Sequence, residues 1–139
     1  MLVVPDEGEL VLLEWMLKSG PSDLHLHLYK NDYSPTREST AIDFTDCDFV
    51  DYYIALLEPS NWSGPVLDDG AAQLVWGPGF ITWATTGTDQ YAFGYFVTTE
   101  DDATVVWAER FAAPQLVTIT SPILVRPVMR LHSEVEPVP

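Results

Sequence analysis

The sequence predicts a mostly β protein, an antiparallel β-sandwich of jelly-roll type with one helix at its N-terminus. Short segments rich in aromatic and β-branched residues recur along the chain, with Gly- and Pro-containing turns between them. The clearest of these segments form a long hairpin, with arms at 90–98 and 104–111 and an acidic tip between them. No internal repeat of fixed period is present in the sequence, which disfavours propellers and solenoids.

The single helix is predicted over residues 6–18. Asp6 follows a proline and is suited to cap the helix, and Lys18 lies in the last turn, where the helix dipole favours a cation. The apolar stripe that would face the core consists of Leu10, Leu13, Met16 and Leu17.

Residues 23–30 alternate between apolar and polar side chains, which predicts the first strand. Its leucines face the core, and His25 and His27 are expected on the opposite, exposed face. In chain order, the remaining expected elements are a loop at 36–51 with a short strand possible at 41–44, a strand at 52–57, a surface loop at 59–70 anchored by Trp62, two strands at 72–76 and 80–85 joined by a tight Gly-Pro-Gly reversal, and two last strands at 115–120 and 123–131.

The length of 139 residues suits one domain with its own core, to which the sequence adds extended arms at 1–5 and 132–139. The formal net charge is −15, so direct binding to nucleic acid or to an anionic membrane is disfavoured. No apolar run is long enough to cross a membrane, and the first residues lack the pattern of a signal peptide. We therefore expect synthesis in a cytoplasm.

Two groups of side chains could bind a metal ion. His25 and His27 share one face of a strand, as in cupin-like jelly rolls, but a site also needs a third ligand, and His132 is the one other histidine. Four aspartates in nine residues could gather calcium ligands, although their spacing does not fit an EF-hand. In both cases a solvated polar surface is the favoured interpretation. The four aspartates are Asp43, Asp46, Asp48 and Asp51.

Nucleophilic catalysis finds little support in the sequence. Cys47 stands among aspartates that would raise the pKa of its thiol, and neither a nucleophile elbow nor a phosphate-binding loop is present. We expect no enzyme activity, no cofactor and no metal. Five tryptophans remain, for which core packing, a sugar-binding platform and subunit contact are the alternatives. They are Trp15, Trp62, Trp76, Trp83 and Trp107.

Several stretches of the chain carry a family resemblance: residues 1–9, the strand at 26–36, the spacing of Phe44, Phe49 and Asp51-Tyr52, and the hairpin residues 95–97 and 106–111. Together they resemble the capsid cement, or decoration, proteins of tailed bacteriophages. The resemblance implies a structural protein of the virion that binds the outer capsid surface, cements neighbouring major capsid subunits, and forms a homodimer or homotrimer.

An acidic, aromatic-rich β domain with extended ends can bury apolar surface between subunits while its outer face stays solvated. Two alternatives are a tail- or fibre-associated or carbohydrate-binding sandwich of a phage particle, and a cupin-like metalloenzyme. The candidate residues for contact with the capsid or with a second copy are Leu2, Val3, Val4, Trp15, Trp107, Arg110, Phe111, Val135 and Val138.

Overall fold

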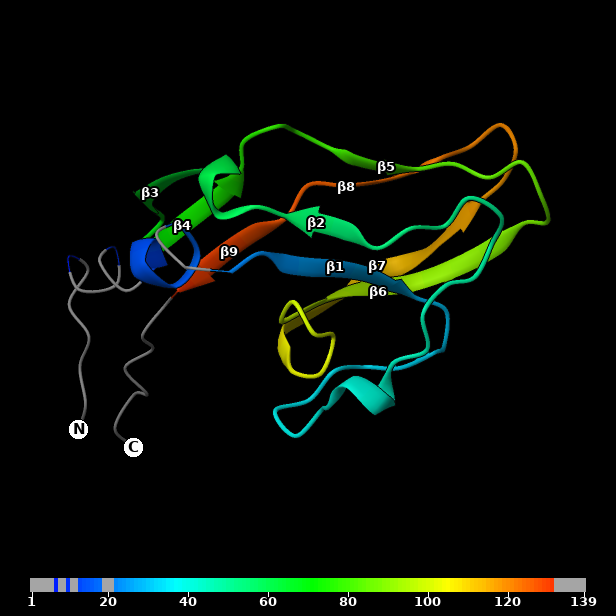
Figure 1. Cartoon of the computed structure of the whole chain (residues 1–139), viewed down its shortest axis with the longest axis horizontal. Helices are drawn as coiled ribbons and strands as arrows, with labels where there is room; N and C mark the ends of the chain where they lie inside the picture. Colours follow the sequence, from blue (N-terminus) through cyan, green and yellow to red (C-terminus); the bar gives the residue numbers. More distant parts are fainter. Residues whose placement is uncertain (1–6, 8–9, 11–12, 19–21, 132–139) are drawn as a thin grey trace. The chain divides into compact units, whose positions relative to one another are not determined.

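The computed structural model describes residues 7, 10, 13–18 and 22–131 of the chain (Figure 1). This part is mostly antiparallel β-structure in three sheets, which confirms the predicted fold class at that level. The chain divides into two compact units. Unit 1 consists of Met1–Pro21, Pro59–Phe80 and Arg126–Pro139, and unit 2 consists of Ser22–Glu58 and Ile81–Val125.

Unit 2 contains the largest sheet, with the strand order β2-β1-β6-β7 (Figure 1). All neighbours in this sheet run antiparallel, and β1 lies between β2 and β6. A second, two-stranded sheet pairs β5 with β8. The elements of unit 2 are β1 (Leu24–Tyr29), the short 3-10 helix η2 (Ala41–Asp43), β2 (Ala55–Leu57), β5 (Ile81–Trp83), β6 (Gln90–Thr98), β7 (Val105–Val117) and β8 (Ile123–Val125).

The predicted hairpin is present as β6 and β7. Strand β6 has the predicted bounds, but β7 runs past the expected end at Phe111 to Val117. Gly94 pairs with Arg110 and Ala92 pairs with Gln115, so one residue of β6 lies opposite residues 111–114 of β7. This bulge accommodates Pro114, which has no N–H to donate to the ladder.

Strand β1 is buried on both faces, which corrects the expectation of an exposed histidine face. Leu26 and Leu28 are buried as predicted, and His27 on the opposite face is only 4% exposed. A strand in the middle of a covered sheet loses solvent on both sides. The alternation of polar and apolar residues identified the strand correctly but not the burial of its polar side.

Tyr29 and Gly94 are cross-strand partners whose sizes are matched. A Cβ atom built on Gly94 would lie 2.6 Å from the hydroxyl oxygen of Tyr29 and would clash with the carbonyl oxygen of Glu109. The Tyr29 ring therefore occupies the space above the glycine, and its hydroxyl donates to the carbonyl of Tyr33 at 3.0 Å. The ring is fully buried and packs with Phe44 and Phe96.

Unit 1 contains a three-stranded antiparallel sheet of order β3-β4-β9. The prediction of a surface loop at 59–70 is wrong, because most of this segment forms β3. Trp62 is buried, as predicted. Trp62 packs edge-on against Trp76 with ring centroids 5.4 Å apart. The elements of unit 1 are the π-helix η1 (Glu14–Lys18), the 3-10 helix η3 (Pro59–Asn61), β3 (Trp62–Asp68), β4 (Ala71–Trp76) and β9 (Val128–Leu131).

Other sequence expectations are corrected by the strand pairing. The segments at 72–76 and 80–85 are strands, but β4 pairs with β3 and β9, and β5 pairs with β8, so they do not pair with each other. The last segment, 123–131, is divided at Pro127, whose carbonyl accepts the backbone N–H of Trp76. Residues 41–43 form η2 in place of a strand.

Residues 6, 8, 9, 11 and 12 of the predicted helix at 6–18 lie outside the described residues, and so do the arms at 1–5 and 132–139. The helical element given within this segment is the short η1, in which Leu17 is buried and Met16 is exposed. None of the helices in the described ranges is long and apolar enough to span a membrane.

We predict that Gly94→Ala destabilises the protein by about 2–4 kcal/mol, because the new methyl group overlaps the Tyr29 ring and a strand carbonyl. Chemical denaturation followed by tryptophan fluorescence measures the change. Gly70→Ala is the matched control, since it meets no atom within 4 Å. Its left-handed backbone still costs about 1–2 kcal/mol. Equal losses for the two variants would contradict the packing of Tyr29 over Gly94.

Candidate functional site

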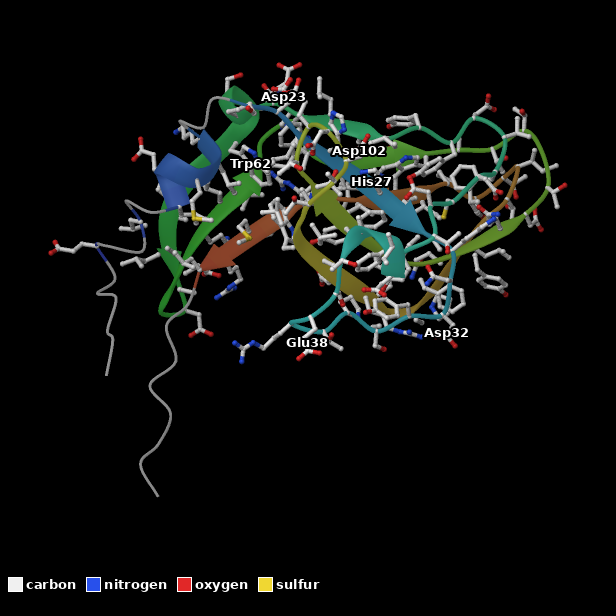
Figure 2. The ribbon with its side chains drawn as sticks, turned by 60° about the horizontal axis from the view of Figure 1, so that its bottom comes forward. Asp23, His27, Asp32, Glu38, Trp62 and Asp102 are labelled. Carbon is white, nitrogen blue, oxygen red and sulfur yellow. The ribbon has the colours of Figure 1, made fainter. Side chains whose placement is uncertain are left out.

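The most distinctive group of polar side chains lies on one face of the unit 2 sheet. We call it the histidine cluster and define it as His25, His27, Asp46, Thr98 and Asp102. The two histidines come from β1, Thr98 ends β6, Asp46 lies in the loop after β1, and Asp102 lies in the hairpin tip. Figure 2 shows Asp102 next to His27, at the end of the sheet where the tip folds back.

His27 is at the centre of the histidine cluster. Its Nδ1 lies 2.9 Å from a carboxylate oxygen of Asp46. Its Nε2 lies 3.0 Å from the Thr98 hydroxyl and 3.1 Å from a carboxylate oxygen of Asp102. The same Asp102 oxygen accepts from Nδ1 of His25 at 2.8 Å. The four ionisable groups thus form one chain in which carboxylates and imidazoles alternate.

The ring of His27 is also packed between aromatic side chains. It stacks on Phe96 with centroids 4.4 Å apart and an interplanar angle of 14°. Phe96 stacks in turn on Phe44 at 4.5 Å and 16°. Stacking fixes the plane of the imidazole, and the hydrogen bonds fix its rotation within that plane.

The surroundings of His27 accommodate two arrangements of its protons. In both, Nδ1–H donates to Asp46, because an ionised carboxylate can only accept. In the neutral ring the Thr98 hydroxyl donates to Nε2, whereas in the imidazolium Nε2–H donates to the Thr98 hydroxyl, which donates in turn to the Asp102 carboxylate 3.3 Å away. The hydrogen bonds of His27 are therefore satisfied in either charge state.

Asp102 reaches the histidines because the tip of the hairpin turns back. The residue has φ 60, in the left-handed region that aspartate tolerates better than most residues. Its N–H donates to the carbonyl of Thr99, and Asp101 holds the same turn by accepting from the Thr99 hydroxyl. Of the three carboxylates in the acidic tip, at residues 100–102, the one of Asp102 is bound to side chains of the sheet.

The pKa of Asp102 lies below its usual range. Partial burial raises this pKa, but the hydrogen bond from His25, the charges of His27 and His25, and the Thr98 hydroxyl together lower it by more. The ionised carboxylate is therefore the form that the fold favours.

Two groups next to Asp46, the Tyr52 hydroxyl and the Cys47 thiol, keep their protons. The hydroxyl of Tyr52 lies 3.5 Å from Asp46 and accepts the backbone N–H of Leu28 at 3.1 Å. Burial and the nearby Asp46 charge raise the pKa of Tyr52 far above its usual value. Burial, followed by the charges of Asp46 and Asp48, raises the pKa of the Cys47 thiol to about 12, as the sequence indicated in direction. Neither group is a nucleophile at neutral pH.

The side chains proposed as metal ligands are instead engaged in hydrogen bonds with other residues. His25 and His27 bond carboxylates, as described above. No group of three or more His, Cys, Asp or Glu side chains in the described residues is arranged to hold a metal ion. The four loop aspartates are engaged separately: Asp43 accepts from the backbone of Thr40, Asp46 from His27, Asp48 from Lys30 and Gln90, and Asp51 from Thr86.

The tryptophans mostly serve the core. Trp62, Trp76 and Trp83 are at most 5% exposed, so they cannot stack on a sugar, and Trp83 donates its indole N–H to the carbonyl of Tyr53. Trp107 on β7 is half-buried. The side chain of Trp15 lies outside the described part of the structure.

The other predicted contact residues fall into two groups. Arg110 is engaged within the chain, with its guanidinium paired to Asp32 and placed 5.5 Å from the centroid of the Phe93 ring. Phe111 is half-buried and tilts against Tyr95. Those outside the described residues are Leu2, Val3, Val4, Val135 and Val138.

Sequence reasoning singled out the histidine pair but missed the two carboxylates that bind it. Asp46 and Asp102 are 19 and 77 residues away from the histidines they bond, so no local spacing reveals them. The one available signal was the concentration of aspartates in the loop and in the tip. Twenty-one acidic residues made that signal uninformative.

We predict that His27→Leu destabilises the protein by about 2–3 kcal/mol, because Thr98 and the two carboxylates lose their shared partner. Thermal or urea denaturation at pH 7 measures the change. His25→Leu is the matched control, because that histidine lies on the same strand, is partly exposed and bonds one carboxylate. We expect it to lose less than half as much, and a larger loss for His25→Leu would contradict the central role of His27.

Asp102 gives the cluster a pH dependence of known sign. Its pKa in the folded state lies below the unfolded value of about 3.9, so its contribution to stability is present above pH ~4 and is lost as the pH falls through the folded pKa. Asp102→Asn should therefore be less stable than the wild type at pH 7, and the gap should close on acidification. Urea denaturation from pH 7 to 3 tests this, with Glu100→Gln as the control in the same tip. A gap independent of pH would refute the assignment.

Comparison of the chain with protein-family models, with curated proteins and with solved structures finds no match. What the protein does is therefore inferred from its own residues, from the family resemblance of its sequence and from the surfaces of its two units.

Proposed function

We propose that the protein is a structural component of a tailed-phage particle, a cement protein that binds the outer capsid surface and joins neighbouring major capsid subunits. The resemblance of residues 26–36 and 106–111 to such proteins supports this role. The histidine cluster suits it as well, since its hydrogen bonds connect strands, loop and tip within unit 2. We propose accordingly that the protein is not an enzyme and that its partners are the major capsid protein and further copies of itself.

A group of exposed apolar side chains in unit 2 carries the proposal. We call it the apolar end and define it as Tyr91, Leu116, Ile119 and Leu124. Tyr91 and Leu116 are direct cross-strand partners on β6 and β7, so they share a face. Ile119 lies in the turn closed by Thr118 and Ser121, and Leu124 follows on β8.

Three of the four residues of the apolar end are more than half exposed. Ile119 is 71% exposed, Leu124 54% and Tyr91 53%. Exposed aliphatic and aromatic groups on a chain of net charge −15 fit a contact surface with an apolar centre and a solvated acidic surround. We infer that the apolar end is the part of unit 2 that contacts the major capsid protein.

For the fold, we propose that the sheets of unit 2 form a jelly-roll-like sandwich. In the two-stranded sheet, Trp83, Ile123 and Val125 are buried while Thr82 and Leu124 are exposed, so the sheet has one inner and one outer face. The larger sheet offers the buried side chains of Leu26, Leu28 and Val97 on a single face. Two such faces are what a sandwich brings together.

The direct test is binding to capsids of the phage whose genome encodes the chain, after their decoration proteins are stripped. We expect the wild-type protein to cosediment with these capsids and to raise the temperature at which they break. The triple variant Tyr91→Ser, Ile119→Ser, Leu124→Ser should bind more than about tenfold more weakly, because it loses about 1 kcal/mol or more of apolar contact at each position.

The matched control is Val66→Ser with Leu67→Ser, which removes exposed apolar groups from β3 in unit 1. It should bind as the wild type does, and circular dichroism should show that both variants are folded. Failure of the wild-type protein to bind stripped capsids would refute the cement function. Equal binding by the triple variant would refute the role of the apolar end.

A further inference from the structure

A groove in unit 2 runs beside the free edge of the large sheet. Its volume is about 510 Å³. Strand β7 is the last strand of the order β2-β1-β6-β7, and among the described residues it pairs with β6 alone. The groove is lined on one side by the β7 residues Val105, Val106, Trp107 and Ala108, and on the other by Pro35, Thr36, Arg37 and Ser39.

The wall of the groove opposite β7 is held in place by its own hydrogen bonds. The hydroxyls of Ser39 and Tyr33 lie 2.6 Å apart. The backbone N–H of Thr36 donates to the Ser39 hydroxyl at 2.8 Å, and the Ser39 N–H donates back to the Thr36 carbonyl at 3.1 Å. The space beside β7 is therefore preformed, as a site for an added strand requires.

Arg37 gives this groove a positive charge, which is scarce in a chain with six lysines and arginines and twenty-one acidic residues. All six lysines and arginines lie in the described part of the chain, and Arg37 alone among them has no hydrogen bond or ion pair there. Its neighbour Glu38, labelled in Figure 2, is not among the lining residues. The other five are paired: Lys18 with the Gly64 carbonyl, Lys30 with Asp48, Arg110 with Asp32, Arg126 with the Trp76 carbonyl and Arg130 with Asp68.

We propose that residues 132–139 of a second copy of the chain bind in this groove as a strand added to β7, with Glu134 and Glu136 directed at Arg37. The proposal rests on the homo-oligomer of the proposed function and names the surface that makes it. A guanidinium and a strand edge that have no partner among the described residues fit an extended acidic segment, because carboxylates pair with the cation while the backbone pairs with β7.

The sequence and length of the segment fit the groove. In a strand Glu134 and Glu136 point to the same side, and Val135 points to the other. The eight residues that follow the end of β9 at Leu131 extend to roughly 26 Å, about twice the length of the four β7 residues that line the groove. The segment is thus long enough to lie along these four residues of β7.

Charge reversal on the full-length chain tests the proposal by sedimentation velocity at low salt. We expect the wild type to self-associate. Arg37→Glu should weaken association roughly tenfold, because attractions become repulsions, and so should Glu134→Lys with Glu136→Lys. The variant that combines all three changes should regain most of the wild-type affinity. Arg130→Glu makes the same charge change in unit 1 as Arg37→Glu and should leave association unchanged.

Three results would overturn the proposal: a monomeric wild type at all concentrations, reversals without effect, or no recovery in the combined variant. Reversals that change only the stability of a monomer would place the segment on its own chain and overturn the exchange between copies. Capsid binding separates the two proposals. Binding that persists without groove-dependent association leaves the cement function intact, whereas rescued association without capsid binding supports the groove alone.

Discussion

The hydrogen-bonded imidazole of His27 is the interaction on which unit 2 depends. It joins four separate pieces of chain: strand β1, the loop with Asp46, the end of β6 at Thr98 and the hairpin tip with Asp102. A buried polar ring costs free energy unless its nitrogens are bonded, so the loop and the tip must adopt the positions that bond them. Loop and tip conformation are thereby tied to the sheet.

Aromatic packing on the same face explains how a polar group is tolerated there. The His27 ring continues a stack through Phe96 to Phe44, and Tyr29 meets Phe44 edge-on. Gly94 provides the room that the Tyr29 ring needs. The face is thus a continuous aromatic layer, with hydrogen bonds at one end, and the loop that carries Phe44 and Asp46 covers it.

What the sequence could predict followed from local pattern, and what it missed depended on distant contacts. Strands β1 and β6 were predicted from alternation and aromatic content, and Trp62 as a buried anchor. Strand β3 was missed because Pro65 and two glycines suggest a loop, yet β3 lies at a sheet border with a register shift between Ser63 and Val66, where a proline removes no necessary hydrogen bond. The partners of β4 and β5, and the carboxylates around His27, depend on pairing across many residues that no local spacing encodes.

The bulge at 111–114 divides the open side of β7 into two short stretches. A long, regular edge would template strand after strand, as in fibrils, because each added strand presents a new edge. Here Pro114 and the bulged residues interrupt the row of backbone groups, so an incoming chain finds only a few successive partners on either side. The bulge thus makes β7 suited to closed complexes with a fixed number of copies and unsuited to open-ended polymerisation.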